Sequence, residues 1–230
     1  MSLFNLAVLI SGSGSNLQAV IDAVANGMIP NAKVTVVISN RANAFGLERA
    51  EKCGITNMVI EKNETSKLLD ILKTYDIHGI VLAGYLSILP SEIIHAYNGK
   101  IINIHPALLP LFGGKGFYGL KVHRAVLASG APYSGATAHL VDCGVDTGAV
   151  LVRGVVPVHS GDTAESLQKR VLDVEHFILV RAVKALVRGE IEEFKNRPVT
   201  IVDDRDKQGV LEYAKGLSEL GEALTKAFVG

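Results

Sequence analysis

The feature of this sequence that most restricts its fold is a regular alternation of short apolar runs with segments of helical periodicity. The apolar runs lie at residues 5–10, 33–39, 57–60, 79–83 and 101–104. The segments between them repeat apolar residues at three-and-four spacing, as an amphipathic helix does. Because strands that alternate with helices form right-handed βαβ units, we predict a Rossmann-like, mostly parallel twisted sheet flanked by helices.

The second half of the chain departs from this alternation. Two apolar runs, at residues 134–141 and 150–156, are joined by a short turn, so we expect them to pair as antiparallel strands. Before them, glycines crowd residues 111–120, which predicts a mobile loop, and a helix is expected over residues 121–129. The predicted fold class is therefore α/β, with an antiparallel strand pair in the C-terminal half.

A long helix and a tail complete the chain. The helix is expected to begin at a capping box formed by Asp162 and Glu165 and to end at Arg188. In the tail, the sequence predicts a short strand at residues 199–202 and a final helix at residues 210–228. Since no linker and no internal repeat interrupts the sequence, we expect a single domain over residues 1–230.

Charge and cysteine content narrow the classes of partner and compartment. Lys and Arg total 23, as do Asp and Glu, so no global field attracts nucleic acid or an anionic membrane. Cys53 and Cys143 lie far apart and outside any C-x-x-C pair, so neither a disulfide framework nor a zinc site is expected. The apolar N-terminus lacks a basic segment and is typical of a first strand rather than a signal peptide, which predicts a cytoplasmic protein.

A run of small residues follows the first predicted strand: Gly12-Ser13-Gly14-Ser15-Asn16. The dinucleotide fingerprint would place a third glycine where this chain has Leu17, and the lysine of a P-loop is also absent. The free N–H groups that begin the following helix can still bind an anion, which favours a small phosphate over NAD or ATP. A plain tight turn between strand and helix is the alternative.

An amide and an imidazole occur together at the end of another predicted strand. Asn103 and His105 are two residues apart, so their side chains point to the same face. Pro106 favours an extended backbone at His105. Ligands of open α/β sheets bind at the carboxyl ends of strands, where this pair and the glycine loop can meet, although a lone strand-end His is more often structural.

Acidic residues further along are candidate partners for this pair. Asp146 lies in a glycine-flanked turn after His139, and a carboxylate facing His105 would orient its ring and favour its charged form. Asn, His and Asp without a suitably placed Ser or Cys favour direct attack on a carbonyl carbon, with amide and ring stabilising the oxyanion. An ordinary turn aspartate is the alternative. Glu175, beside His176 in the long helix, is by itself typical of a solvated helix face.

Three segments together resemble the folate-dependent formyltransferase family, in the branch that formylates glycinamide ribonucleotide. In chain order they are Ile10-Ser11-Gly12-Ser13-Gly14-Ser15-Asn16-Leu17-Gln18, Asn103-Ile104-His105-Pro106-Ala107-Leu108-Leu109-Pro110, and His139-Leu140-Val141-Asp142 leading into Asp146-Thr147-Gly148. The resemblance extends over about residues 5–189. It implies a nucleotide-binding half over residues 1–100, a catalytic and folate half over residues 101–195, and an extension at residues 196–230.

The resemblance also implies a reaction and a site. The formyl group of 10-formyltetrahydrofolate, a co-substrate, passes to the amine of glycinamide ribonucleotide in purine synthesis, without a metal. The implied catalytic residues are Asn103, His105 and Asp146; the phosphate site is Gly14, Ser15 and Asn16; the ribose contact is Glu175. The implied folate contacts are Leu86, Ser87, Ile88, Leu89, Asn103, Val141, Asp142 and Asp146. Ser87 stands where some members of the family carry an arginine.

Other classes stay open from the sequence. A formyltransferase acting on an aminoacyl-tRNA would add a C-terminal domain and a basic surface, and one acting on a sugar nucleotide is a further relative. A formyltetrahydrofolate hydrolase would add an N-terminal regulatory domain. A nucleotide-binding oxidoreductase or a non-catalytic binding module would use the glycine loop alone. We expect only small-molecule partners, and either a monomer or a homodimer.

Overall fold

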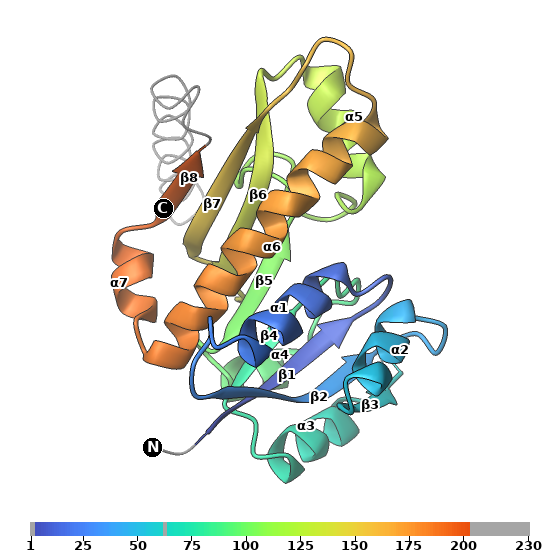
Figure 1. Ribbon diagram of the computed structural model, residues 1–230, viewed down its shortest axis with the longest axis vertical. Coiled ribbons are helices and arrows are strands. Elements are labelled where there is room, and N and C mark those ends of the chain that lie inside the picture. Colours follow the sequence, from blue (N-terminus) through green and yellow to red (C-terminus); the bar gives the residue numbers. More distant parts are fainter. Residues whose placement is uncertain (1–2, 62–63, 203–230) are drawn as a thin grey trace.

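The computed structural model describes residues 3–61 and 64–202 and contains a twisted sheet covered by helices on both faces (Figure 1). The strands are β1 (Phe4–Ile10), β2 (Ala32–Ser39), β3 (Thr56–Val59), β4 (Gly79–Leu82), β5 (Ile101–His105), β6 (Tyr133–Leu140), β7 (Val150–Pro157) and β8 (Val199–Val202). Their order across the sheet is β3-β2-β1-β4-β5-β6-β7-β8. Strands β1 to β5 are parallel, β6 is antiparallel to both β5 and β7, and β8 is parallel to β7. The predicted fold class is confirmed.

The helices divide between the two faces of the sheet. They are α1 (Ser15–Ala25), α2 (Phe45–Lys52), α3 (Thr65–Thr74), α4 (Ser91–Ala96), α5 (Leu120–Ser129), α6 (Ala164–Arg188) and α7 (Ile191–Asn196). Alternate residues of β1 serve different cores: Leu6 and Val8 pack with α1 and α6, whereas Ala7 and Leu9 pack with α3 and α4. A parallel sheet buried on both faces needs such continuous apolar strands, which explains the unbroken run that begins the chain.

The long helix α6 begins one residue later than the sequence predicts. Its N-cap is Thr163, whose hydroxyl accepts a hydrogen bond from the backbone of Ser166, while the Ser166 hydroxyl accepts one from the backbone of Thr163. The predicted capping box of Asp162 and Glu165 was therefore wrong. Asp162 instead forms an ion pair with Arg170 at 2.7 Å. The carboxylate that was predicted to cap the helix therefore binds Arg170.

Other differences concern the ends of elements. Strand β5 continues one residue beyond its predicted end, to His105, and α7 was not predicted because six residues are too few to show periodicity. Residues 111–119 form irregular turns, as predicted, whereas Leu120 already belongs to α5; the mobility of this loop stays a prediction. The predicted final helix, at residues 210–228, lies outside the described residues.

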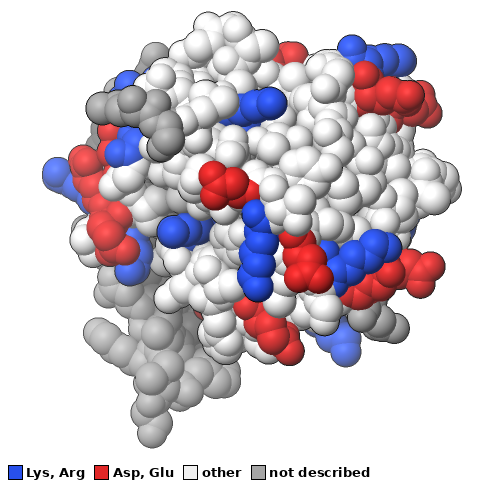
Figure 2. All heavy atoms as spheres, turned by 90° about the horizontal axis from the view of Figure 1, so that it is seen from below, with Lys and Arg blue, Asp and Glu red and all other residues white. Residues whose placement is uncertain are grey.

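The surface and the helix lengths complete the description. Figure 2 shows Lys and Arg beside Asp and Glu on the face seen from below, so neither sign forms a continuous patch there. Within the described residues, each helix is too short or too polar to cross a lipid bilayer.

Candidate active site

A cavity of about 690 Å³ opens at the carboxyl ends of β1, β4 and β5. Strand β1 lies between β2 and β4, and the chain leaves β1 toward one side and returns to β4 on the other. The loops after β1 and β4 therefore diverge, which leaves a crevice at this switch point. All residues that the sequence and the resemblance single out for the site line this cavity: Gly14, Ser15, Asn16, Leu86, Ser87, Ile88, Leu89, Asn103, His105, Val141, Asp142, Asp146 and Glu175.

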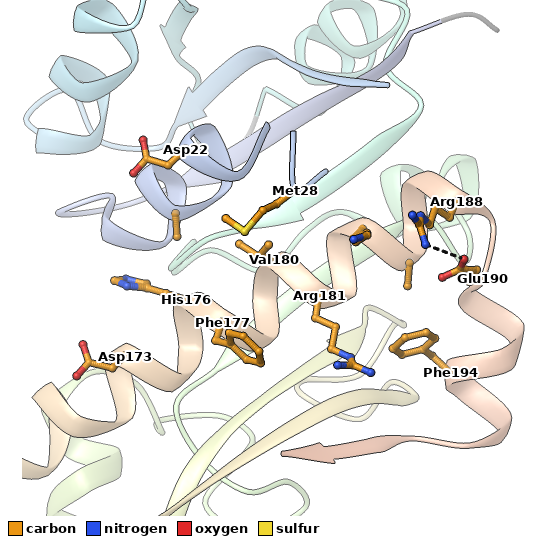
Figure 3. A pocket seen from close by; sticks show the side chains of 13 residues that line it. Asp22, Met28, Asp173, His176, Phe177, Val180, Arg181, Arg188, Glu190 and Phe194 are labelled. Atoms are coloured by element: carbon orange, nitrogen blue, oxygen red, sulfur yellow. Dashed lines mark ion pairs between the residues drawn. The ribbon is translucent and has the colours of Figure 1, made fainter. Parts of the chain in front are cut away.

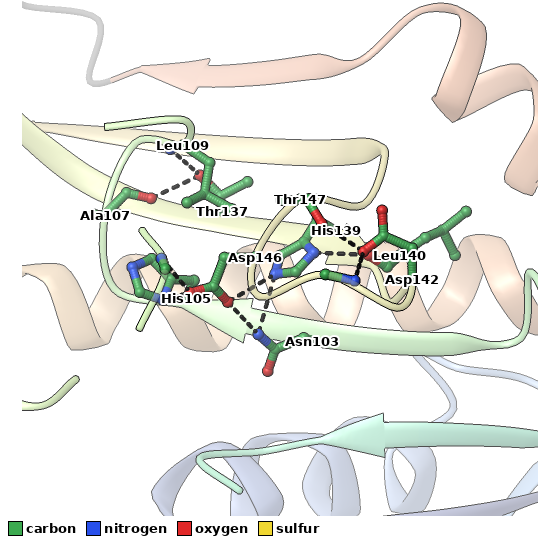
Figure 4. A network of polar contacts seen from close by, with 12 residues as sticks. Asn103, His105, Ala107, Leu109, Thr137, His139, Leu140, Asp142, Asp146 and Thr147 are labelled. Carbon is green, nitrogen blue, oxygen red and sulfur yellow. Dashed lines mark hydrogen bonds and ion pairs between the residues drawn. The ribbon is translucent and has the colours of Figure 1, made fainter. Parts of the chain in front are cut away.

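Asn103, His105 and Asp146 meet through the carboxylate of Asp146 (Figure 4). Asp146 Oδ2 lies 3.4 Å from His105 Nδ1, and Asp146 Oδ1 accepts a hydrogen bond from Asn103 Nδ2 at 3.3 Å. Asn103 and His105 project from one face of β5, two residues apart, as their spacing predicts. The three side chains thus form one contiguous polar set on the cavity wall.

The turn between β6 and β7 brings Asp146 to this position. Asp146 adopts a left-handed backbone with φ of 59°, which is uncommon outside glycine. The side chain of Asp142 accepts hydrogen bonds from the Gly144 N–H and the Thr147 hydroxyl and so closes the turn. A Cβ atom at Gly148 would lie 1.8 Å from the carbonyl oxygen of Leu140, so only glycine fits there.

Hydrogen bonds hold Asp146 in its ionised form. Burial raises the pKa of this carboxyl, but the nearby rings of His139 and His105 and the N–H of Gly114 outweigh burial, so the pKa is lowered. The Gly114 N–H donates to Asp146 Oδ2 at 3.0 Å, which ties the glycine-rich loop to the site. An ionised Asp146 supplies a fixed negative charge beside His105.

His105 lies between two acceptors. Its Nδ1 faces Asp146, and its Nε2 lies 2.8 Å from the carbonyl oxygen of Phe112. Burial lowers the pKa of His105 below its ordinary value, and Asp146 and the Phe112 carbonyl oxygen oppose only part of that shift. The imidazolium form satisfies both contacts, and a neutral ring leaves one of them unmade.

His139 is a further member of this set to which the sequence assigned no role. It stands opposite Asn103 in the antiparallel pairing of β5 with β6. Its Nδ1 lies 2.7 Å from the carbonyl oxygen of Leu140, so this nitrogen carries a hydrogen, and its Nε2 then accepts from Asn103 Nδ2 at 3.0 Å. His139 thereby fixes which way the Asn103 amide points. Its place seven residues before Asp146, at the start of the same motif, was the available signal in the sequence.

The glycine loop forms the N-terminus of α1. Gly14 is the N-cap residue, has φ of 71°, and would carry a Cβ 2.6 Å from the Cα of Gly46. None of the described side chains caps this helix end, and Gly14, Ser15 and Asn16 line the cavity. A helix N-terminus of this kind attracts an anion through its N–H groups and its dipole.

Glu175 contacts the glycine loop and does not lie on a solvated helix face. Its Oε2 accepts a hydrogen bond from Asn16 Nδ2 at 2.6 Å, and both side chains are buried. Burial raises the pKa of Glu175 to about 7, and the bond from Asn16 opposes part of that shift. The sequence contained one indication that Glu175 is buried. Helical spacing places it on the same side of α6 as Val171, Ile178 and Leu179, which are buried.

Hydrogen bonds between loops fix the segment that follows β4. The Ser11 hydroxyl donates to Asn40 Oδ1 and accepts from the Leu86 N–H, and Asn40 Nδ2 donates to the Ser87 hydroxyl at 2.6 Å. The side chain of Ile88 is exposed at the cavity mouth, whereas Leu89 is buried. The loops after three neighbouring strands are therefore held as one cavity wall.

A second cavity, of about 660 Å³, lies between α1, α6 and α7 (Figure 3). Its lining combines the exposed side chains of Met28 and Phe177 with charges of both signs, among them Asp173 and Arg181. None of the residues predicted for the site lines it. Among the described residues, no group of three or more His, Cys, Asp or Glu side chains is placed to hold a metal ion. The cavity at β1, β4 and β5 is therefore the candidate active site.

Comparisons with known proteins identify proteins that this chain resembles. Residues 4–183 match the family model described as formyl transferase. A chloroplastic phosphoribosylglycinamide formyltransferase of Vigna unguiculata is 44% identical over 193 residues, which cover 81% of this chain and 62% of that protein. The human trifunctional purine biosynthetic protein adenosine-3 is 38% identical, over 86% of this chain and 20% of its own length. This chain thus spans less than two thirds of either relative.

Solved structures give the same result at the level of the fold. Glycinamide ribonucleotide transformylase 1 from Symbiobacterium toebii superposes with a TM-score of 0.76 at 38% identity, covering 81% of this chain and 89% of that one. A formyltetrahydrofolate deformylase from Pseudomonas syringae has a TM-score of 0.74 at 23% identity, over 82% of this chain and 62% of that one. The latter likeness concerns the fold alone.

Proposed function

Because the chain belongs to the formyl transferase family, we propose that it transfers the formyl group of 10-formyltetrahydrofolate to the amine of glycinamide ribonucleotide, a reaction of purine synthesis. One observation carries the proposal. A single cavity brings together a helix N-terminus suited to phosphate, a buried carboxylate, and the set of Asn103, His105 and Asp146. These are the parts needed to bind a ribonucleotide and to stabilise an oxyanion.

The ribonucleotide is anchored at the β1–α1 loop. Its phosphate accepts hydrogen bonds from the N–H groups of Gly14, Ser15 and Asn16 at the positive end of α1. Glu175 contacts a ribose hydroxyl; its hydrogen bond with Asn16 supports placing the phosphate and ribose sites side by side. Anchoring at this end leaves the amine free to reach β5, whose end lines the same cavity.

The folate lies along the segments that follow the two neighbours of β5. Strand β4 leads into the wall formed by Leu86 to Leu89, and β6 leads into the turn of Val141 to Asp146. Ser87 is already bonded to Asn40, so this segment offers the folate backbone groups and apolar surface rather than a charged side chain. The formyl group then sits between Asn103 and the incoming amine.

The chemistry is a direct acyl transfer. The neutral amine attacks the formyl carbon, a C–N bond forms, and the carbonyl oxygen becomes an oxyanion that Asn103 and His105 stabilise. One N–H of Asn103 is bonded to His139, and the other makes the longer 3.3 Å contact with Asp146, which the oxyanion can replace. The intermediate collapses with cleavage of the bond to the folate nitrogen. Asp146 orients His105, favours its charged form and helps to move the proton that the amine loses to that nitrogen.

The test is a direct assay of the proposed reaction. The protein is mixed with glycinamide ribonucleotide and a 10-formyl folate, and release of the deformylated folate is followed by absorbance. We expect release that depends on the ribonucleotide, with formylated ribonucleotide as the second product. Release that is independent of any amine would assign a hydrolase instead, and no release would overturn the proposal.

The proposal also includes the compartment and the oligomeric state of the protein. We propose a cytoplasmic enzyme that is a monomer or a homodimer; the plant relatives from Vigna unguiculata and Arabidopsis thaliana are named as chloroplastic proteins. Imaging of the tagged full-length protein checks the compartment, and sedimentation at several concentrations checks the assembly.

A further inference from the structure

The mechanism above leaves a buried histidine of the same cavity unused. His123 lies in the first turns of α5, is 0% exposed, and lines the cavity with Asn103 and His105. Neither of its ring nitrogens has a hydrogen-bond partner among the residues that the structure describes. Buried polar side chains are nearly always hydrogen-bonded, because an unmade bond costs free energy. This ring therefore needs a physical explanation.

The His123 ring is neutral at physiological pH. Burial first, and then the positive charge of nearby His105, lower the pKa of His123 to about 4. A neutral imidazole has one N–H donor and one bare nitrogen that accepts. His123 can thus accept a hydrogen bond without placing a second positive charge beside His105.

The position of α5 puts this ring along the path of the ribonucleotide. Helix α5 packs against α6, and α6 carries Glu175 at the phosphate and ribose end of the cavity. Leu172 and Gln168, about one and two turns before Glu175, line the same cavity. A ligand that extends from Glu175 along α6 passes these residues and reaches the region of α5 and His105.

We propose that His123 contacts the amine substrate and orients its nucleophile. The bare ring nitrogen accepts a hydrogen bond from the attacking amino group, which directs the lone pair of the amine toward the formyl carbon. The ring gains a bond that it lacks in the free protein, and no proton is transferred to it. This contact rests on the proposed function, because it adds a residue to that same site. Orientation of this kind acts on the rate, since the reacting atoms must be aligned before attack.

The substitution His123→Leu tests the contact. Leucine has a similar volume but neither ring nitrogen, so kcat/KM for the ribonucleotide is expected to fall roughly tenfold to a hundredfold. The KM for the formyl folate should stay within about twofold, because the contact is made to the other substrate. His123→Asn or His123→Gln, which restore a donor and an acceptor, should recover part of the loss.

Thermal unfolding separates this role from a structural one. The unfolding midpoint of His123→Leu should equal or exceed that of the wild type, since the variant removes two buried polar atoms that lack partners. Ser134→Ala is the matched control, because Ser134 Oγ is also buried without a partner among the described residues but does not line the cavity. Its kinetics should match the wild type.

Two results would overturn the proposed contact of His123 with the amine but not the proposed function. One is a wild-type kcat/KM in His123→Leu. The other is a lowered unfolding midpoint in His123→Leu together with a loss of kcat/KM that neither His123→Asn nor His123→Gln recovers. A wild-type protein that shows no ribonucleotide-dependent transfer would overturn the proposed function itself, and this contact with it. The wild-type assay therefore distinguishes the two failures.

Discussion

The carboxylate of Asp146 holds the proposed catalytic set together. Asn103 and His105 both contact this carboxylate, and all three side chains face the cavity. Removal of one oxyanion donor typically costs about 3–4 kcal/mol of barrier. We expect Asn103→Ala, His105→Ala and Asp146→Asn each to lower kcat about 10²- to 10³-fold with little change in unfolding midpoint.

Steady-state kinetics and thermal unfolding of the three variants check this prediction. Ser134→Ala is a suitable control, because Ser134 is buried but does not line the cavity. A variant that keeps near-normal turnover removes its residue from the proposed set.

Glu175 gives a prediction about pH and stability. Burial raises its pKa from an ordinary value of 4.5 to about 7, so the folded protein holds this proton more tightly than the unfolded chain. The stabilising contribution is complete below about pH 4.5 and is lost as the pH rises through 7. At pH 8 we expect Glu175→Gln, which cannot ionise, to be more stable than the wild type by on the order of 3 kcal/mol.

Denaturant unfolding of both proteins at pH 4.5 and pH 8 measures the difference. The two curves should nearly coincide at the lower pH, where both side chains are neutral. An equal difference at both pH values would show that the titration of Glu175 is not its cause.

At the scale of elements, the β1–α1 loop depends on its contact with α2. Gly46 donates a backbone hydrogen bond to the carbonyl oxygen of Gly12, and a Cβ at Gly14 would strike the Cα of Gly46. Because Gly14 is also left-handed, we expect Gly14→Ala to lower the free energy of unfolding by about 1–3 kcal/mol. The same strain should raise KM for the ribonucleotide more than KM for the folate.

The matched control for this prediction lies in the same loop. A Cβ at Gly12 meets nothing within 4 Å, and its φ is not left-handed, so Gly12→Ala should be tolerated. Equal losses in both variants would indicate that the loop tolerates no side chain at all and would contradict the role assigned to the Gly14–Gly46 contact.

At the scale of the whole molecule, the cavity is shared by the parallel and antiparallel parts of the sheet. Loops after β1 and β4 supply one wall, and the β6–β7 turn with α5 and α6 supplies the other. The division into a nucleotide-binding half and a folate half stays a prediction. A ligand held by both walls stabilises the folded chain as a unit, because it binds only the native state.

Ligand-dependent unfolding tests this arrangement. Glycinamide ribonucleotide at about 100 times its Kd should raise the free energy of unfolding by about 2.7 kcal/mol. At the same concentration, Gly14→Ala should gain much less, since its phosphate site is distorted. Calorimetry across a concentration series provides the measurement, and an absence of any shift in the wild type would count against the ribonucleotide as ligand.

The sequence by itself determined the local parts of this protein. Apolar runs and helical spacing depend on neighbours a few residues apart, so they predicted the sheet class, the antiparallel pair and the glycine loop before α1. The spacing of Asn103 and His105 predicted that both would face the same side. The same local reasoning missed α7, which is too short for periodicity, and chose Asp162 over Thr163 as the cap of α6.

Only the tertiary structure decided how the distant residues meet. Asp146 reaches His105 because the β6–β7 turn bends back with a left-handed residue, and His139 meets Asn103 because of the register of β5 with β6. Glu175 holds a proton near neutral pH because α6 buries it against Asn16. The residues in each of these contacts are between 36 and 159 positions apart, so packing and register, which no local pattern contains, determine the site.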